Sequence, residues 1–418
     1  MKNNILKPAI LLALCSLTAN AGALEDRVSK LEDMLSKSKP TSMDNRFFND
    51  FEFHGYARVG AFLNKDGESA GIAALDGIPS KNRLGNESKA YWEAELVKGF
   101  DIGKESWAKF HIMFQGGNDN YDPYGGDKNA NIPNLFVEMG GVLPNKDAVA
   151  WVGRRFNARE DIHITDFYYR NYSGTGFGLQ NIKLGEGKLN TSLVLKDIDS
   201  SDKTYTFHNE YTQGNWNYEL ALKSGDNSTS NVADSGIEMS VDYSLSGFYG
   251  LSNGWSKIVL QAGKGLSAGS GLGNSGSNTN LDDASSFRVL TTGLMESDNF
   301  LLMPQLVYQH DNNYDGKENA KRDWFSVAAR PVVPINKNFA MQFGLAYDYV
   351  TLNKEASDKK GGLFSATIAP TLKLDSSNFW NRPELRLFAN YNKFTGDQIN
   401  IKEEGDGFNF GMQAEVWF

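Results

Sequence analysis

The sequence predicts an all-β fold, a transmembrane antiparallel β-barrel of about eighteen strands, and three observations support this prediction. Segments of strand length alternate between two kinds of side chain, with clusters of Gly, Asn, Asp and Ser between them. The chain carries 42 glycines and 12% aromatic residues at a mean hydropathy of −0.45, without an apolar run long enough for a membrane helix. Its last segment alternates up to a terminal phenylalanine, as expected of a strand that closes a barrel. A secreted soluble all-β protein is the alternative that composition leaves open.

The segment 51–62 shows the alternation most clearly. Its small or apolar face carries Phe53, Gly55, Ala57, Val59 and Ala61, and its polar and aromatic face carries Glu52, His54, Tyr56, Arg58 and Phe62. If the apolar face meets lipid, the other face lines a lumen. The lumen face then holds an aromatic ring two positions from an arginine, a pairing suited to binding a sugar.

The last segment, 407–418, sorts in the same way. Its apolar face carries Phe408, Phe410, Met412, Ala414, Val416 and Phe418, and its other face carries Asn409, Gly411, Gln413, Glu415 and Trp417. Because a closed barrel has no sheet edge, this strand must pair with the first one. That pairing predicts that Trp417 lies in the lumen with Tyr56.

Eighteen alternating segments are expected along the chain. They lie near residues 51–63, 89–99, 106–116, 133–140, 147–154, 178–183, 189–196, 203–211, 215–223, 236–243, 255–264, 285–295, 299–309, 322–332, 338–350, 362–373, 384–394 and 407–418. The longest expected loops are 64–88, 117–131, 155–177 and 265–284, the last rich in Ser, Gly and Asn and expected to be mobile. An even number of strands with long polar loops on one side is typical of a bacterial outer-membrane barrel around an aqueous channel.

Residues 1–21 have the features of a secretory signal peptide. Lysines precede an apolar run over 9–17, and small residues offer a cleavage point after Ala21 or Ala23. The run is too short to span a bilayer as a helix. The one cysteine, Cys15, lies inside this peptide, so the mature chain should contain neither a disulfide nor a thiolate site.

Three further segments complete the expected organisation. Residues 24–39 form a short periplasmic segment with a heptad seam of Leu24, Val28, Leu31 and Leu35. Two heptads make a stable coiled-coil helix only where an assembled barrel brings several copies together. A lone amphipathic helix or a disordered linker is the alternative. Residues 40–50 are expected to be a linker, and 51–418 the transmembrane barrel.

Four stretches of the chain carry a resemblance to a known family. They read Phe53-His54-Gly55-Tyr56-Ala57-Arg58, Arg83-Leu84-Gly85-Asn86-Glu87, Arg159-Glu160-Asp161-Ile162-His163 running on to Asp166-Phe167-Tyr168-Tyr169, and Ala414-Glu415-Val416-Trp417-Phe418. With these motifs at family-like spacing, the chain resembles the maltoporins, sugar-specific porins that are eighteen-stranded trimers. The middle of the chain, about 200–370, matches by strand rhythm alone.

The resemblance implies an outer-membrane channel through which oligosaccharides, foremost maltodextrins, diffuse passively along a line of aromatic rings called the greasy slide. It implies a homotrimer in outer-membrane lipid, and no cofactor. The implied slide residues are Tyr56, Tyr91 and Trp417, with Tyr121 supplied by a neighbouring subunit. The implied polar track beside the slide is Arg58, Arg83, Glu93, Arg159, Asp161 and Asp166. Tyr168 is implied at the constriction, on a third loop folded into the barrel.

The residues themselves support part of these roles. Tyr91 and Glu93 share one face of their expected strand with Glu95, while Trp92 and Leu96 share the lipid face. An aromatic of the membrane interface should lie on the apolar face, and the slide tyrosines do not. The charged residues could instead form a wall of structural ion pairs, as in general porins.

The chain also departs from the family's pattern. Where well-known members carry another channel arginine, spacing places Ile132-Pro133-Asn134, which offers fewer hydrogen-bond donors. The heptad segment resembles an extension of sucrose-type porins. The sugar therefore stays open between maltodextrins, sucrose and β-glucosides, and a non-selective general porin is a further alternative.

No catalytic residue or metal site is expected. Residues 265–269 fit a Gly-x-Ser-x-Gly hydrolase pattern but lack the helical segment that should follow the serine. Asp161 and Asp166 could form a glycosidase pair, but their motif already matches a channel loop. The five histidines show no metal-ligand spacing. A net charge of −9 argues against a nucleic-acid partner. An outer-membrane phospholipase would need a Ser–His pair on the lipid-facing wall.

Overall fold

The computed structural model describes residues 51–87, 90–101, 105–118, 131–196, 203–225, 232–275, 280–354, 357–396 and 405–418. Nearly all of them belong to one compact unit, Glu52–Phe418. The expected signal peptide, coiled-coil segment and linker lie outside the described residues, as does Tyr121. Over the described ranges, no helix combines the length and the apolar character that crossing a bilayer requires.

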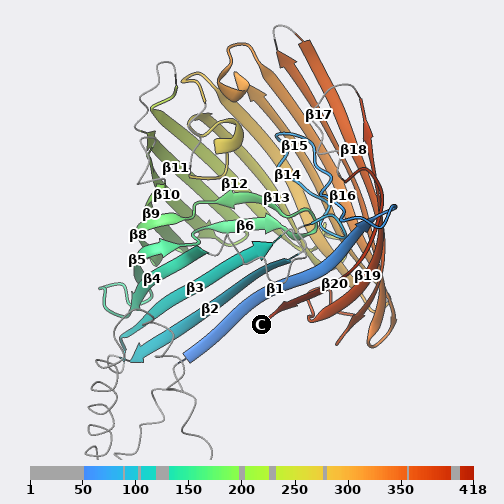
Figure 1. Ribbon diagram of the computed structural model, residues 1–418. Helices are drawn as coiled ribbons and strands as arrows, with labels where there is room; N and C mark the ends of the chain where they lie inside the picture. Colours follow the sequence, from blue (N-terminus) through green and yellow to red (C-terminus); the bar gives the residue numbers. More distant parts are fainter. Residues whose placement is uncertain are drawn as a thin grey trace, which may run out of the picture. The chain divides into compact units, whose positions relative to one another are not determined.

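Among the described residues, eighteen strands form one antiparallel sheet (Figure 1). They are β1 (Phe51–Asn64), β2 (Ala90–Asp101), β3 (Trp107–Asn118), β4 (Asn131–Gly140), β5 (Val149–Arg155), β8 (Gly174–Leu184), β9 (Gly187–Lys196), β10 (Thr204–Gln213), β11 (Trp216–Gly225), β12 (Ser235–Phe248), β13 (Ser252–Gly265), β14 (Ser285–Ser297), β15 (Phe300–Asn312), β16 (Lys321–Asn336), β17 (Phe339–Lys354), β18 (Ser357–Lys373), β19 (Glu384–Thr395) and β20 (Gly407–Trp417). β1 pairs with both β2 and β20, so the sheet closes without an edge. The predicted eighteen-stranded antiparallel barrel is therefore confirmed, each expected segment matching one strand.

The connections at the two ends of the barrel differ in length. Two residues join β8 to β9, β10 to β11 and β16 to β17, whereas β1 and β2 are separated by 65–89 and β13 and β14 by 266–284. In outer-membrane barrels the short turns face the periplasm and the long loops face outward. β1 therefore begins, and β20 ends, at the periplasmic end.

Along β1 and β20 the outer wall exposes large apolar side chains at alternating positions. Val59 of β1 and Met412 of β20 are 60% and 59% exposed, while the neighbouring Arg58 and Gln413 are buried on the inner side. The two faces expected for the first and last strands are thus confirmed. An apolar band outside and polar residues inside are what a barrel in lipid requires.

The third long loop contains regular structure that the sequence did not reveal. Where a loop was expected over 155–177, the chain forms β6 (Arg159–Ile162), a 3₁₀ turn η2 (His163–Thr165) and β7 (Phe167–Asn171). β6 and β7 pair with each other in a sheet separate from the barrel. We call residues 159–171 the lumen hairpin.

The lumen hairpin packs on an apolar patch of the inner wall. Ile162, Ile164 and Phe167 join a buried cluster with residues of β14–β17, and the Phe167 ring meets Trp324 edge-on at a centroid distance of 5.1 Å. This packing surface lies more than a hundred residues further along the chain. A reading of local periodicity could not connect the two.

The Gly-x-Ser-x-Gly motif lies at the end of β13 and is followed by a single 3₁₀ turn, η3 (Gly269–Gly271). The Ser267 hydroxyl is buried without a hydrogen-bond partner in the described structure. The composition predicted a mobile loop over 265–284, and within it residues 266–275 are mostly buried. Asn280 contributes to this packing, because its side-chain amide donates to the carbonyls of Gly265 and Ala268 at 2.9 and 2.6 Å.

Candidate functional site

Loops and the lumen hairpin fill one part of the barrel interior. The inward side chains of β14–β17, such as Leu290, Val307 and Trp324, are almost fully buried. Tyr56 of β1 and Tyr91 of β2 keep partial exposure on their inward faces. Tyr56, Tyr91 and Trp417 therefore remain partly accessible on the inner face of the wall formed by β1, β2 and β20.

Four aromatic rings follow one another along this wall. The ring centroids of Tyr91 and Tyr56 are 5.8 Å apart, those of Tyr56 and Trp417 are 6.4 Å apart, and those of Trp417 and Trp380 are 6.4 Å apart. The planes of Tyr56 and Trp417 are 22° from parallel. Strand parity and barrel closure predict that Tyr56, Tyr91 and Trp417 share the inner face. In the structure their rings lie next to one another there.

Trp380 is the member of this line that the sequence did not reveal. It lies in the turn between β18 and β19 and not in a strand, so alternation gives it no face. A usable signal was the pair Phe379-Trp380 in a short turn, since two large aromatics there need a surface to pack on. Phe379 supplies that anchor, because it is buried in the interior apolar cluster while Trp380 remains 36% exposed.

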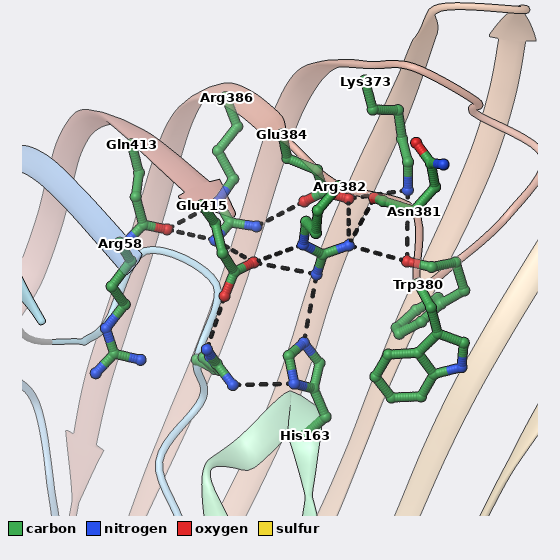
Figure 2. A network of polar contacts seen from close by, with 12 residues as sticks. Arg58, His163, Lys373, Trp380, Asn381, Arg382, Glu384, Arg386, Gln413 and Glu415 are labelled. Carbon is green, nitrogen blue, oxygen red and sulfur yellow. Dashed lines mark hydrogen bonds and ion pairs between the residues drawn. The ribbon is translucent and has the colours of Figure 1, made fainter. Parts of the chain in front are cut away.

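A buried network of charges lies behind the aromatic line, around Glu415 (Figure 2). The Glu415 carboxylate accepts from Arg83 at 2.7 Å, from Arg382 at 3.0 Å and from Arg386 at 3.1 Å. It also accepts a hydrogen bond of 2.8 Å from the hydroxyl of Tyr56, to which Arg83 is bonded as well. A slide ring and the charged network are thus joined through one hydroxyl.

Two further contacts tie this network to the wall. Arg58 and Arg83 share the carboxylate of Glu87, at 2.7 and 3.2 Å. The guanidinium carbon of Arg382 lies 3.9 Å from the centroid of the Trp417 ring, a cation–π contact that holds the indole in place. The network is shielded from solvent, since the side chains of Glu87, Arg382 and Glu415 are all buried.

The lumen hairpin brings its own charged and aromatic groups. The Arg159 guanidinium lies between the rings of Phe156 and Tyr168, 3.8 and 4.5 Å from their centroids. The Tyr168 side chain remains 39% exposed. Partial loss of hydration inside the barrel raises the pKa of the exposed Asp161 carboxyl, an effect that the nearby charge of Arg83 opposes.

The other predicted site residues are placed as follows. On β2, the hydroxyl of Tyr91 donates to Glu93 at 2.5 Å. Asp166 follows η2 in a left-handed conformation, with φ of 52°. In the stretch Ile132-Pro133-Asn134, Asn134 is buried and its side-chain amide donates to Glu95 at 3.0 Å.

The sequence reading missed the acidic partners of the arginines. Alternation places Glu415 on the inner face of the last strand, and Glu87 lies within the second motif, but the sequence alone predicts a role for neither. The available signal was an inward carboxylate on the strand that must pair with β1, beside Arg58. Within the described ranges, no cluster of three His, Cys, Asp or Glu side chains suits a metal ion.

Residues 51–418 match the family model described as LamB porin. The chain belongs to the LamB porin family. This LamB porin is 30% identical over 405 residues to a maltoporin of Vibrio cholerae serotype O1 (strain ATCC 39315 / El Tor Inaba N16961), with 88% of the chain and 94% of that protein covered. It is also 30% identical over 407 residues, with the same coverage, to maltoporin 2 of Yersinia pseudotuberculosis serotype O:1b (strain IP 31758).

Among solved structures, OccK2 (OpdF) of Pseudomonas aeruginosa aligns with this LamB porin at a TM-score of 0.49 and 11% identity. That alignment covers 88% of the chain and 98% of OccK2. The resemblance to maltoporins deduced from the four motifs is thus confirmed by the family match and by the maltoporin relatives. The LamB porin resides in the bacterial outer membrane.

Proposed function

We propose that this LamB porin is a channel for the facilitated, passive diffusion of oligosaccharides, with maltodextrins as the preferred class. The observation that carries the proposal is the line of Tyr91, Tyr56, Trp417 and Trp380, with centroid separations of 5.8 to 6.4 Å. A sugar ring has an apolar face of C–H groups that stacks on an aromatic ring. At this spacing a sugar can contact the next aromatic ring before it has left the previous one.

The hydroxyl rim of the sugar needs polar partners of both kinds. Arginines only donate hydrogen bonds and carboxylates only accept them, and both occur beside the rings. In this proposal Arg159 donates, while Glu93, Asp161 and Asp166 accept. Arg58 and Arg83, which are buried, belong to the polar track as the cations that hold Glu87 and Glu415 behind the rings. Exchange of hydrogen bonds along such a track keeps each binding step weak, which a conducting channel requires.

Tyr168 is proposed to narrow the path. It is the partly exposed aromatic of the lumen hairpin, and Arg159 stacks on its ring. A sugar confined between Tyr168 and the aromatic line would pass in single file. No covalent step is involved, so the concentration gradient supplies the driving force.

Assembly is a separate part of the proposal. We propose a homotrimer in which Tyr121 of a neighbouring subunit joins the slide and in which the segment 24–39 forms a three-stranded coiled coil. The family relationship and the heptad spacing in the sequence support both points.

Two alternatives concern the substrate. A channel for sucrose or β-glucosides would use the same rings and is favoured by the heptad segment. A non-selective porin is favoured by the ion pairs, since a buried charge network can stabilise the barrel wall without contacting a sugar.

Liposome swelling distinguishes these possibilities. Maltotriose and raffinose are both trisaccharides, so their sizes match while their linkages differ. We expect liposomes containing the full-length protein to swell faster in maltotriose. Equal rates for the two sugars would contradict a path shaped for maltodextrins.

A further inference from the structure

Arg330 is a buried arginine with unused hydrogen-bond donors. It lies on the inward face of β16, is 2% exposed, and its Nε and Nη2 atoms have no hydrogen-bond partner in the described structure. A buried guanidinium without acceptors is strongly unfavourable. Something other than the described side chains must supply them in the working protein.

The carboxylates whose charges attract Arg330 are already engaged. These are Glu415 and Glu87, while Arg386 and Arg83 repel it. Glu415 accepts from three arginines, and Glu87 holds Arg58 as well as Arg83. The arginines around Arg330 therefore outnumber these two carboxylates, and neither carboxylate bonds to Arg330 in the described structure.

His163 adds a second group in need of an acceptor. Its Nδ1 lies 2.9 Å from Arg83 and its Nε2 lies 3.5 Å from Arg382. Figure 2 marks the contact between His163 and Arg382 with a dashed line. A neutral imidazole has one accepting nitrogen, and arginine cannot accept at all. If Nδ1 accepts the shorter hydrogen bond, from Arg83, then Nε2 carries the proton and its N–H faces the N–H groups of Arg382.

Two elements carry these donors to one region of the inner wall. The turn η2, which contains His163, packs against β16, and Arg330 acts electrostatically on His163. On β17, Gln342 pairs with Val332, two positions from Arg330, and its buried Nε2 has no hydrogen-bond partner in the described structure. Diagonal neighbours across paired strands are within reach of long side chains.

We propose that Arg330, with Gln342 and His163 beside it, forms a site for a small anion, a halide or an oxyanion such as a carboxylate or phosphate group. An anion supplies acceptors to the unused donors and offsets the excess positive charge. The anion can be dissolved in the medium or be an acidic group on a permeating saccharide. The chemistry of recognition is the same for both.

Anomalous diffraction from crystals of the full-length protein grown in sodium bromide tests the site. We expect one bromide peak at the Arg330 guanidinium and a loss of affinity of about tenfold or more in Arg330→Gln, because a hydrogen bond to a charged group is removed. Arg322→Gln is the matched control, since Arg322 lies inward on the same strand but is paired with Asp311 at 2.7 Å. That variant should keep the peak.

A second variant covers the case in which Arg330→Gln does not fold. One oxygen of Glu87 has no hydrogen bond and lies 3.8 Å from Arg386. The negative charge of Glu87 therefore competes with an added anion for the positive charge of this region. Glu87→Gln should therefore increase bromide occupancy. Water alone at Arg330 in the parent, a peak that survives in Arg330→Gln, or an occupancy that falls in Glu87→Gln would overturn the proposal.

Bilayer currents separate the two sources of the anion. If the acidic group of a sugar binds, a galacturonate trisaccharide should block the current at lower concentration than maltotriose, and Arg330→Gln should abolish that difference. If a dissolved anion binds, bromide occupies the site but the two sugars block alike. The bromide peak is read without any sugar, so its absence and a failure of sugar transport are distinguishable.

Discussion

Tyr56 and Trp417 stand directly opposite each other where the first and last strands of the barrel pair, with their rings nearly parallel. The central platform of the aromatic line therefore straddles the closing seam. The hydroxyl of Tyr56 is bonded to Glu415, and the indole of Trp417 lies under Arg382. The two rings come together only where β1 pairs with β20, so this part of the aromatic line depends on closure of the sheet.

Removing both rings should weaken sugar binding while the ion conductance remains. Aromatic contacts contribute about 0.5–1.5 kcal/mol each, so Tyr56→Ala with Trp417→Ala should weaken block by maltodextrin about tenfold. Single-channel currents with added maltohexaose measure this. Tyr56→Phe is the control, because it keeps the ring and loses only the hydroxyl with its bonds to Glu415 and Arg83. If maltodextrin blocks the double variant and the parent equally, neither Tyr56 nor Trp417 contributes to sugar binding.

Truncating Tyr168 should widen the channel. Its side chain is partly exposed at the lumen hairpin, so Tyr168→Ala should raise the single-channel conductance roughly twofold if this point is the narrowest. Tyr168→Phe retains the ring and should conduct like the parent. An unchanged current in the alanine variant would place the constriction elsewhere.

Arg170 should hold the lumen hairpin against the barrel wall. Its guanidinium, 1% exposed, pairs with Glu219 of β11 at 2.8 Å and Asp242 of β12 at 2.5 Å. Arg170→Gln leaves two buried carboxylates without their cation, which costs about 3–5 kcal/mol. We expect a noisier open-channel current and a lower unfolding temperature.

The matched control for Arg170 is Arg154→Gln. Arg154 is exposed and bonded to the carbonyl of Ile132 at 3.3 Å, so its loss should change stability by no more than about 0.5 kcal/mol. Quiet currents and an unchanged unfolding temperature in Arg170→Gln would show that the hairpin is held by its apolar contacts alone.

His163 should make stability fall in mild acid. Burial, with the charge of Arg83 added, holds its pKa well below the usual 6.5. Between the folded-state pKa and 6.5 the unfolded chain binds more protons, so the free energy of unfolding decreases as pH falls from about 6.5. Asp161, whose pKa is raised by loss of hydration, acts in the opposite sense at lower pH.

Denaturant unfolding of the parent and of His163→Gln at pH 7.5 and pH 5 measures this effect. The parent should lose stability between the two values, and the variant should lose less. The same loss in both proteins would assign the pH dependence to other groups.

The part of this fold that the sequence predicts is the part written in local alternation. A period of two places Tyr56, Arg58 and Trp417 on the inner face before any long-range contact is known. The pairing of Tyr56 with Trp417 then follows from the need to close the sheet. Strand parity also places Tyr91 on the inner face, where its ring lies next to that of Tyr56.

The rest depends on contacts between distant segments. The lumen hairpin is stabilised by Trp324 and its neighbours, far along the chain, so its own short segments carry too little periodicity to predict it. Trp380 lies in a turn, where no alternation applies. The role of Glu415 appears only when Arg83, Arg382 and Arg386 converge on it from a loop, a turn and a strand.

The central claim is that sugars bind along the line of Tyr91, Tyr56, Trp417 and Trp380. Its most direct test is the ion current through the full-length protein in a planar bilayer during separate titrations with maltodextrins, sucrose and β-glucosides. We predict a saturable block by maltodextrins at lower concentration than by the other two sugars. A current that no sugar reduces would contradict a sugar-binding channel.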